Sequence, residues 1–233
     1  HINETQRVHI ITLEDPIEYV FEDKLAVINQ REIGTDTHDF AQGLRRALRQ
    51  DPDVILIGEL RDPETMTTAM NAAETGHLVL GTLHTNDAKQ TIDRIIDTFP
   101  PEQQNQIRLQ LAKCLLAVVA QRLVKKAGGD GRIALQEIMI NSATIQKLIE
   151  DNKVGAIGKA IEDSAEYYKM QSFNQALLSM IARDAVTVEE ALSYSPNPND
   201  LKIRLQSEGI VGTLGPAPRS PLPSGLKVGW MRR

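Results

Sequence analysis

Residues 48–62, LRQDPDVILIGELRD, join the end of a predicted helix to a predicted strand. The helix before the strand carries its apolar residues at helical spacing on one face: Phe40, Leu44, Ala47 and Leu48. Residues 54–57 are a continuous apolar run that closes at Gly58, which is typical of a strand buried on both faces of a parallel sheet. The sequence therefore predicts an α/β fold.

Glu59 follows this strand directly. In open α/β sheets, ligands bind outside the carboxyl ends of the strands, which is where Glu59 is expected to lie. A carboxylate at this place can hold Mg²⁺, or a water bound to it, beside phosphates, because this hard dication prefers oxygen ligands. The alternative interpretation is a solvated acid at a strand end, and the strand and its acid alone leave both open.

A second acidic segment follows another predicted strand. Residues 8–13, VHIITL, have strand character, and the loop EDPIE at 14–18 brings three carboxylates after them. Such a group can bind a cation or activate a water molecule, and it can equally be a solvated turn. Residues 77–85, HLVLGTLHT, predict a third buried strand with a histidine at each end, His77 and His84. A lone strand histidine is more often structural than functional.

The whole string 48–62 resembles the signature of the type II and type IV secretion ATPase superfamily. That signature has Leu-Arg, then Pro-Asp, three aliphatic residues, and Gly-Glu-aliphatic-Arg-Asp, and this chain matches it without a mismatch. The resemblance covers residues 8 to 210 and implies a RecA-like P-loop NTPase core with a C-terminal helical subdomain. It also implies ATP and Mg²⁺ as ligands, bound at the subunit interfaces of a ring.

The same resemblance implies roles for individual residues. Glu18 takes the place of the proposed base that activates water against the γ-phosphate, and Glu14 is the alternative for that role. His84 contacts the nucleotide or senses its γ-phosphate, whereas His77 could report on a subunit contact. Arg94 could reach a neighbour's phosphate or form an ion pair within its helix. The implied sites are catalytic Glu18, Glu59 and His84; nucleotide-binding Glu14, Asp15, Arg61, His77 and Arg94; and metal-binding Glu59 and Asp15.

Three segments bear on the branch of the superfamily. TIDRIIDTFP at 91–100 and MQSFNQAL at 170–177 resemble the pilus retraction branch, the twitching-motility ATPases. Cys114 is the only cysteine, so the paired CxxC motifs of assembly and type II secretion relatives are absent. TIQKLIED at 144–151 keeps the aliphatic residues of a retraction segment and loses both of its arginines. We expect a retraction motor, with an assembly or type II secretion ATPase as the alternative.

A Gly-rich loop followed by Lys-Ser/Thr, which cradles phosphates in such sites, is not found in this sequence. GAIGKA at 155–160 has glycines too closely spaced, and Ala160 stands where a hydroxyl should reach Mg²⁺. Because the chain begins with His1, we expect that it lacks its natural beginning. We also expect that the chain alone hydrolyses little ATP, and a catalytically inactive interaction module is therefore an alternative of another class.

Composition and net charge narrow the classes of protein that the chain could belong to. The chain has 233 residues, 41% of them hydrophobic, and a net charge of -5. The acidic balance disfavours nucleic acid as a partner, and with it a DNA-dependent ring motor. Without an apolar run of membrane-spanning length the protein is expected to be soluble, and a single cysteine suits a reducing cytoplasm. The resemblance implies a place at the inner face of the cytoplasmic membrane. The resemblance also implies the partners: five further copies in a homo-hexamer, and an inner-membrane pilus platform protein through which alone the protein meets the membrane.

The sequence also predicts a division of the chain. Residues 1–140 form a partial ATPase core, 141–210 a helical subdomain, and 211–233 a flexible, basic, Pro/Gly-rich tail. Asp36 or Thr37 is the predicted cap of the helix that carries Phe40. A long helix is predicted over 102–124, because apolar residues recur at helical spacing, and the last strand is predicted at 133–140.

Overall fold

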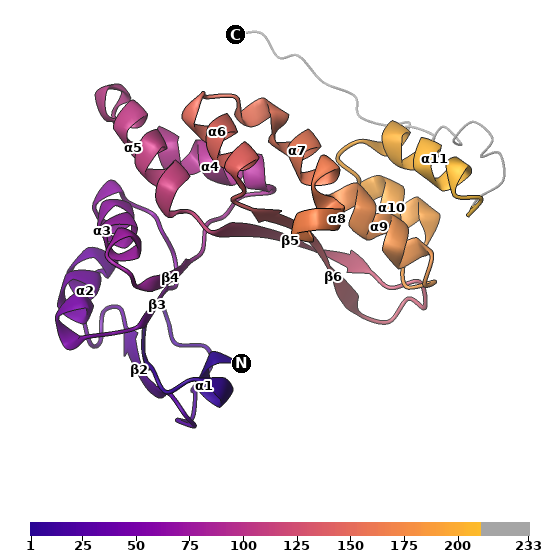
Figure 1. Ribbon diagram of the computed structural model, residues 1–233. Coiled ribbons are helices and arrows are strands. Elements are labelled where there is room, and N and C mark those ends of the chain that lie inside the picture. The colour runs from indigo at the N-terminus through magenta and orange to yellow at the C-terminus, as the bar shows by residue number, and fades with distance from the viewer. Residues whose placement is uncertain (211–233) are drawn as a thin grey trace, which may run out of the picture.

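The computed structural model describes residues 1–210, and the predicted tail at 211–233 lies outside them. A four-stranded parallel sheet forms the N-terminal part, in the order β2-β1-β3-β4 (Figure 1). Its strands are β1 (His9–Glu14), β2 (Val27–Glu32), β3 (Val54–Ile57) and β4 (Leu78–Gly81). Because all four run the same way, the loops that follow β1, β3 and β4 leave the sheet at one edge.

Two helices cover one face of this sheet. They are α2 (Phe40–Ala47), which continues into a 3₁₀ turn (Leu48–Gln50), and α3 (Pro63–Glu74). Side chains from β1, β3 and both helices form a shared apolar cluster: Leu13, Phe40, Leu44, Ile55, Ile57, Ala69 and Ala72. The predicted cap at Asp36 or Thr37 is wrong. Asp39 caps α2 instead, and its carboxylate accepts the Gln42 N–H at 2.6 Å.

The buried strand predicted at 77–85 is shorter and more exposed than expected. β4 spans only Leu78–Gly81 and pairs with β3 alone, at the edge of the sheet described here. Leu78 and Val79 are half-buried, whereas Leu80 and Gly81 are exposed. The apolar run therefore predicted the strand correctly but not its position in the sheet, since periodicity does not distinguish an edge from a centre.

The helix predicted over 102–124 is wrong in its second half. Helix α5 ends at Cys114, and the chain continues as strand β5 (Ala117–Lys125), which pairs antiparallel with β6 (Arg132–Ile140) over nine residue pairs. The β-branched valines of this segment suit a strand, and the partner strand decides between two patterns that both fit the apolar spacing. Asn141 helps to end the helix, because its side-chain amide donates to the carbonyls of Ala112 and Leu115.

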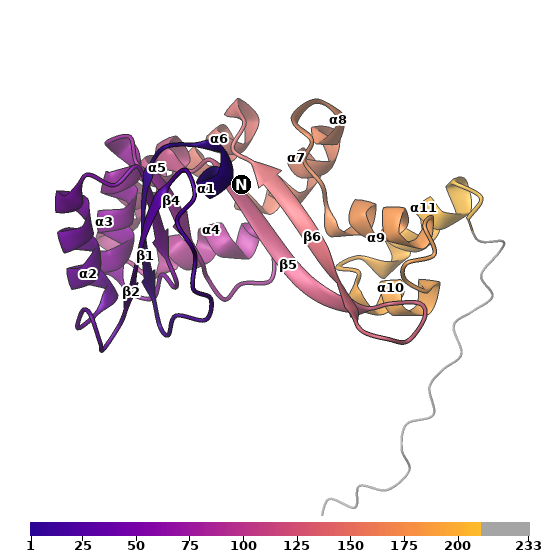
Figure 2. The same cartoon turned by 90° about the horizontal axis from the view of Figure 1, so that it is seen from below.

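The hairpin β5–β6 extends from the helices beside the sheet to α9, α10 and α11 at the far end (Figure 2). The remaining bounds are α1 (Ile2–Thr5), α4 (Ala88–Asp97), α5 (Pro101–Cys114), α6 (Ala143–Glu150), a 3₁₀ turn (Val154–Ala156), α7 (Ile157–Asp163), α8 (Ala165–Tyr168), α9 (Phe173–Ile181), α10 (Val188–Tyr194) and α11 (Pro198–Ser207).

Apolar packing crosses the predicted boundary at residue 140. One cluster joins α3, α4 and α5 to α6 and α7 and includes Met139 of β6. Another joins the distal half of the hairpin to α9, α10 and α11. Because the first cluster contains side chains from both sides of residue 140, the packing does not mark a boundary there. The division at 140 stays a prediction. Within residues 1–210, every helix is too short or too polar to cross a lipid bilayer.

Candidate functional site

The loops after β3 and β4 are tied together at the carboxyl edge of the sheet. The Leu60 N–H donates to the Thr82 carbonyl at 2.9 Å, and the Thr82 hydroxyl donates to the Gly58 carbonyl. The Gly58 N–H in turn donates to Leu13 of β1 at 2.7 Å. These bonds fix the segment that carries Glu59 between its two neighbours in the sheet.

Gly58 is required by this close approach. A Cβ at this position would lie 3.0 Å from the Leu13 carbonyl oxygen and 3.3 Å from the Glu14 Cα, both of which are backbone atoms. Backbone cannot move aside as the tip of a flexible side chain can. The glycine that closes the apolar run of β3 therefore brings the loop after β3 against the end of β1.

Glu59 contacts two basic side chains, one from its own loop and one from the loop after β4. Its Oε2 lies 2.5 Å from an Nη of Arg61, and its Oε1 lies 3.3 Å from Nε2 of His84. Only 17% of the Glu59 side chain is exposed, against 84% for His84. The hydrogen bond from Arg61 is the main cause that lowers the pKa of Glu59, and His84 adds to it, so this carboxylate is ionised at neutral pH. An anionic oxygen and an exposed imidazole thus meet at the end of two neighbouring strands.

The acids after β1 are arranged differently. Glu14 turns toward β2: its Oε1 accepts the amide of Gln30 in β2 at 3.0 Å, as well as the hydroxyl of Thr12 in its own strand β1 at 2.5 Å. The same Gln30 amide also donates to the Tyr19 carbonyl at 2.7 Å. Gln30 therefore anchors the loop after β1 to β2, on the side away from β3.

Asp15 and Glu18 both lie exposed in that loop. Asp15 is near enough to Arg61 for its charge to contribute to the raised pKa of that guanidinium, whose main cause is the bond to Glu59. The carboxylate of Glu18 has no hydrogen bond or ion pair to any residue in the range 1–210. Asp15 thus belongs to the surroundings of Glu59, whereas Glu18 is free to meet a ligand from solvent.

The structure does not bring His77 or Arg94 to this edge. His77 precedes β4, at the opposite end of the strand, and its Nδ1 lies 2.9 Å from the carbonyl oxygen of Ala72 in α3. Arg94 is exposed on α4, and the ion pair found in that helix is Lys89–Asp93. The predicted intrahelical ion pair of Arg94 is therefore not observed among the described residues. Its guanidinium faces solvent.

The sequence did not point to two residues that shape the site, Gln30 and Thr82. Their partners lie far away in the chain, and no local pattern marks such a bond. A third residue, Glu137, could have been recognised from the sequence as a buried carboxylate. It alternates with Leu135 and Met139 along β6, so the period of two places a carboxylate on the buried face of the strand. Its Oε1 accepts the Ala88 N–H at the start of α4, and only 8% of the residue is exposed.

The donor set decides what kind of metal the site fits. Among residues 1–210, no three His, Cys, Asp or Glu side chains gather closely enough to hold a metal ion by themselves. In nucleotide sites Mg²⁺ usually takes one or two carboxylates together with waters and substrate phosphates. Glu59, with Asp15 nearby, meets that need. The residues therefore fit a Mg²⁺ that arrives with a nucleotide.

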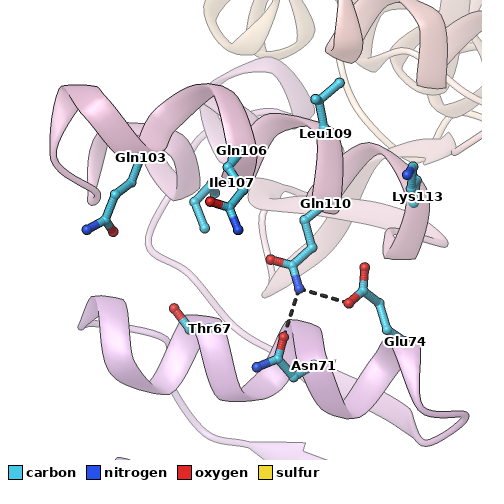
Figure 3. A pocket seen from close by; sticks show the side chains of 9 residues that line it. All are labelled: Thr67, Asn71, Glu74, Gln103, Gln106, Ile107, Leu109, Gln110 and Lys113. Carbon is cyan, nitrogen blue, oxygen red and sulfur yellow. Dashed lines mark hydrogen bonds between the residues drawn. The ribbon is translucent and has the colours of Figure 1, made fainter.

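Two cavities in the described part of the chain lie elsewhere. One of about 570 Å³ separates α3 from α5, and its lining is mostly amide and charged side chains; Gln110 donates there to Asn71 and Glu74 (Figure 3). Another of about 410 Å³ lies between α4, α7, α9 and α11 and includes Glu137. Neither is lined by a residue that the sequence assigned to the site. The candidate site is an open edge of the sheet.

Comparison with known families decides where this chain belongs. The family model described as type II/IV secretion system protein matches residues 1–129, which is more than half of the chain. The chain belongs to this family. The recognition made from residues 48–62 is thereby confirmed.

The similarity extends beyond the matched region. A twitching motility protein of Neisseria gonorrhoeae is 45% identical over 201 residues, which cover 86% of this chain and 54% of that protein. The type IV pilus retraction ATPase PilT of Pseudomonas aeruginosa is 45% identical over 200 residues, 86% of this chain and 58% of that protein. The chain thus spans little more than half the length of these curated relatives.

A solved structure shows the same fold. The crystal structure of the pilus retraction motor PilT with bound ADP superposes with a TM-score of 0.79 at 48% identity, over 87% of this chain and 57% of the other. The predicted α/β fold is confirmed by this match. ADP is bound in that structure.

Proposed function

We propose that this chain is part of an ATP-hydrolysing motor of type IV pilus retraction. The observation that carries the proposal is Glu59, ionised and held between Arg61 and His84 where β3 and β4 end. The 45% identity to two proteins of twitching and pilus retraction supports the biological role. We assign the Gly-rich loop that cradles phosphates to a segment outside this sequence.

Each residue of the edge has a proposed task. Glu59 would hold Mg²⁺, directly or through a water, beside the ATP phosphates, with Asp15 as a second carboxylate. His84 contacts the γ-phosphate from the neighbouring strand end, and Arg61 keeps Glu59 ionised and in place. Glu18, exposed and unpaired, orients the attacking water, with Glu14 as the alternative. Phosphoryl transfer depends mainly on such positioning and on electrostatic stabilisation.

The ring and its surroundings are part of the same proposal. Arg94 faces solvent without an ion partner among residues 1–210, so it can reach a phosphate bound to a neighbouring subunit. A hexamer of the whole protein would then place ATP between subunits. We place this ring in the cytoplasm, at the inner face of the membrane, bound to the pilus platform protein. His77, at the opposite sheet edge, would contact a neighbouring subunit rather than the nucleotide.

ATP turnover by two forms of the protein tests this proposal. The chain as printed is compared with a form extended upstream to include a Gly-rich loop. We expect the extended form to hydrolyse ATP with Mg²⁺ and the short form to do so poorly, because the loop supplies most phosphate contacts. Substantial turnover by the short form, or none by the extended form, would contradict the assignment of the site.

A pilus-assembly or type II secretion ATPase remains the second candidate because of one observation on α6. Gln146 and Glu150 stand where retraction relatives carry arginines, and here the Gln146 amide donates to the Glu150 carboxylate at 3.3 Å. Two cationic positions have thus become a neutral and an acidic one. Deleting the gene distinguishes the branches: we expect cells with unretracted pili, whereas cells without pili would favour the assembly branch.

A further inference from the structure

Arg122 contacts three separate parts of the molecule. It lies in the middle of β5, and one Nη donates to the carbonyl of Asn86, two residues after His84, at 3.1 Å. The other Nη donates to the carbonyl of Tyr194, the last residue of α10, also at 3.1 Å. The guanidinium carbon lies 4.3 Å from the centre of the Phe173 ring, at the start of α9. One side chain thus joins the loop after β4 to two C-terminal helices.

The second strand of the hairpin holds the same loop from the other side. Glu137 of β6 accepts the Ala88 N–H at 2.9 Å, so the first turn of α4 is fixed against the hairpin. Asp87 caps that helix, because its carboxylate accepts the Gln90 N–H at 2.7 Å. The segment 86–88 is therefore held by β5, by β6 and by its own helix cap, immediately after the residue that we assign to the γ-phosphate.

We propose that Arg122 is a positioning residue that couples the His84 loop to α9 and α10, with Glu137 fixing the start of α4. The inference rests on the proposed function, in which His84 contacts the γ-phosphate. When that contact is gained or lost, the loop moves with respect to the sheet, and Arg122 transmits the change to the C-terminal helices. The hairpin is suited to this task because it extends from the helices beside the sheet to those C-terminal helices (Figure 2).

The chemistry of the contacts requires arginine. A guanidinium is planar, carries donors on both Nη atoms and stacks on an aromatic ring, so it can serve two carbonyls and one ring at once. A lysine keeps the charge but offers a single point donor and no flat face. Arg122→Lys should therefore fold and lose coupling, which separates the positioning role from a need for charge alone.

Hydrogen exchange on the chain as printed tests the contact to the loop. In Arg122→Gln, we expect the amides of residues 82–88 to exchange about tenfold faster, because a local tie is lost while the global fold stays. Arg132→Gln is the matched control, since Arg132 is an exposed arginine of the same hairpin. Unchanged exchange in this segment, or a rise spread evenly over the chain, would overturn the positioning role.

Turnover by the extended form tests the coupling. We expect Arg122→Gln to lower kcat about tenfold with the KM for ATP changed less than about twofold, because the nucleotide still binds while His84 is misplaced. We also expect a non-hydrolysable ATP analogue with Mg²⁺ to alter exchange in α9 and α10 in the wild type but not in Arg122→Gln or Arg122→Lys. Arg132→Gln should match the wild type in both experiments.

The outcomes separate this inference from the function on which it rests. If the wild-type extended form hydrolyses no ATP, the proposed function fails, and exchange on the printed chain still decides whether Arg122 holds the loop. If the wild type is active and Arg122→Gln retains its kcat and its response in α9 and α10, the coupling is wrong while the motor assignment stands.

Discussion

The loop after β1 and the loops after β3 and β4 leave the same edge of the sheet but use their acids differently. Glu14, Asp15 and Glu18 are close in sequence, yet Glu14 turns to β2 and Glu18 faces solvent. Glu59 and His84 are far apart in sequence, yet they meet because hydrogen bonds join their loops. The bonds between loops, more than closeness in sequence, therefore decide which residues act together.

The largest expected effect on ATP turnover comes from a substitution of Glu59, in the loops after β3 and β4 that hydrogen bonds join. In the extended form, we expect Glu59→Gln to lower ATP turnover by about 100-fold or more, because the anionic oxygen beside Mg²⁺ is lost. The affinity for ATP should change much less, since the phosphate-binding loop is intact. Steady-state kinetics and equilibrium binding measure the two quantities. Turnover within about threefold of the wild type would remove Glu59 from the site.

The loop after β1 holds two candidates for the residue that activates water, Glu18 and Glu14, and substitutions can distinguish them. We expect Glu18→Gln to lower kcat about 100-fold, as loss of a residue that orients or deprotonates water does. Glu14→Gln should lower kcat less than about tenfold, because that carboxylate is engaged with Thr12 and Gln30. Both variants are measured in the extended form at saturating ATP. The reverse order would assign the base to Glu14 and show that Gln30 orients it.

Sequence reasoning predicted the sheet well and the hairpin poorly, for a physical reason. A strand such as β3 is marked by its own apolar run and closing glycine, so residues 54–58 suffice to predict it. The segment 117–125 fits a helical and a strand pattern, and only its pairing with β6 decides between them. The residues of that segment alone do not determine this pairing.

The candidate site likewise contains some features that could be predicted from the sequence and others that could not. That Glu59 and His84 lie close together could be predicted, because each comes within three residues of the end of a strand, and parallel strands bring such residues to one edge. Gln30 turns Glu14 away, and Thr82 joins the two loops, through contacts between distant positions. A local pattern carries no information on either contact.

A smaller effect is expected from disturbing the close approach of the loop after β3 to the end of β1. Gly58→Ala should lower the free energy of unfolding by about 1–3 kcal/mol, because the new Cβ meets backbone of β1. Gly158→Ala, where no heavy atom lies within 4 Å of the added Cβ, is the matched control. It should be neutral or stabilise helix α7 by up to about 1 kcal/mol. Equal denaturant midpoints for the two variants would show that the close approach at Gly58 is not tight.

The smallest expected effect is on the pH dependence of stability. It comes from Glu137, which holds the start of α4 after the loop that carries His84. Burial raises the pKa of Glu137 above its ordinary value of 4.5, and Asp87 and Glu162 raise it further, while the Ala88 N–H and Arg122 lower it. The folded protein thus binds this proton more tightly than the unfolded chain does. Stability from Glu137 is therefore complete below about pH 4.5 and is lost as the pH rises through the folded pKa.

Glu137→Gln removes this titration and keeps an oxygen that accepts the Ala88 N–H. We expect the variant to gain stability relative to the wild type as the pH rises from 4 to 8, measured by urea unfolding at each pH. Glu102→Gln, at an exposed acid of α5, supplies the background. Parallel curves for the wild type and Glu137→Gln at every pH would contradict the buried, proton-binding Glu137.

A double-mutant cycle on ATP turnover tests most directly whether the two joined loops act as one site. The extended form is measured as wild type, Glu59→Gln, His84→Ala and the double variant. We predict that the loss of kcat in the double variant is clearly smaller than the product of the two single losses, as found for groups that act as a unit. Losses that multiply would show that Glu59 and His84 act independently and would contradict the account.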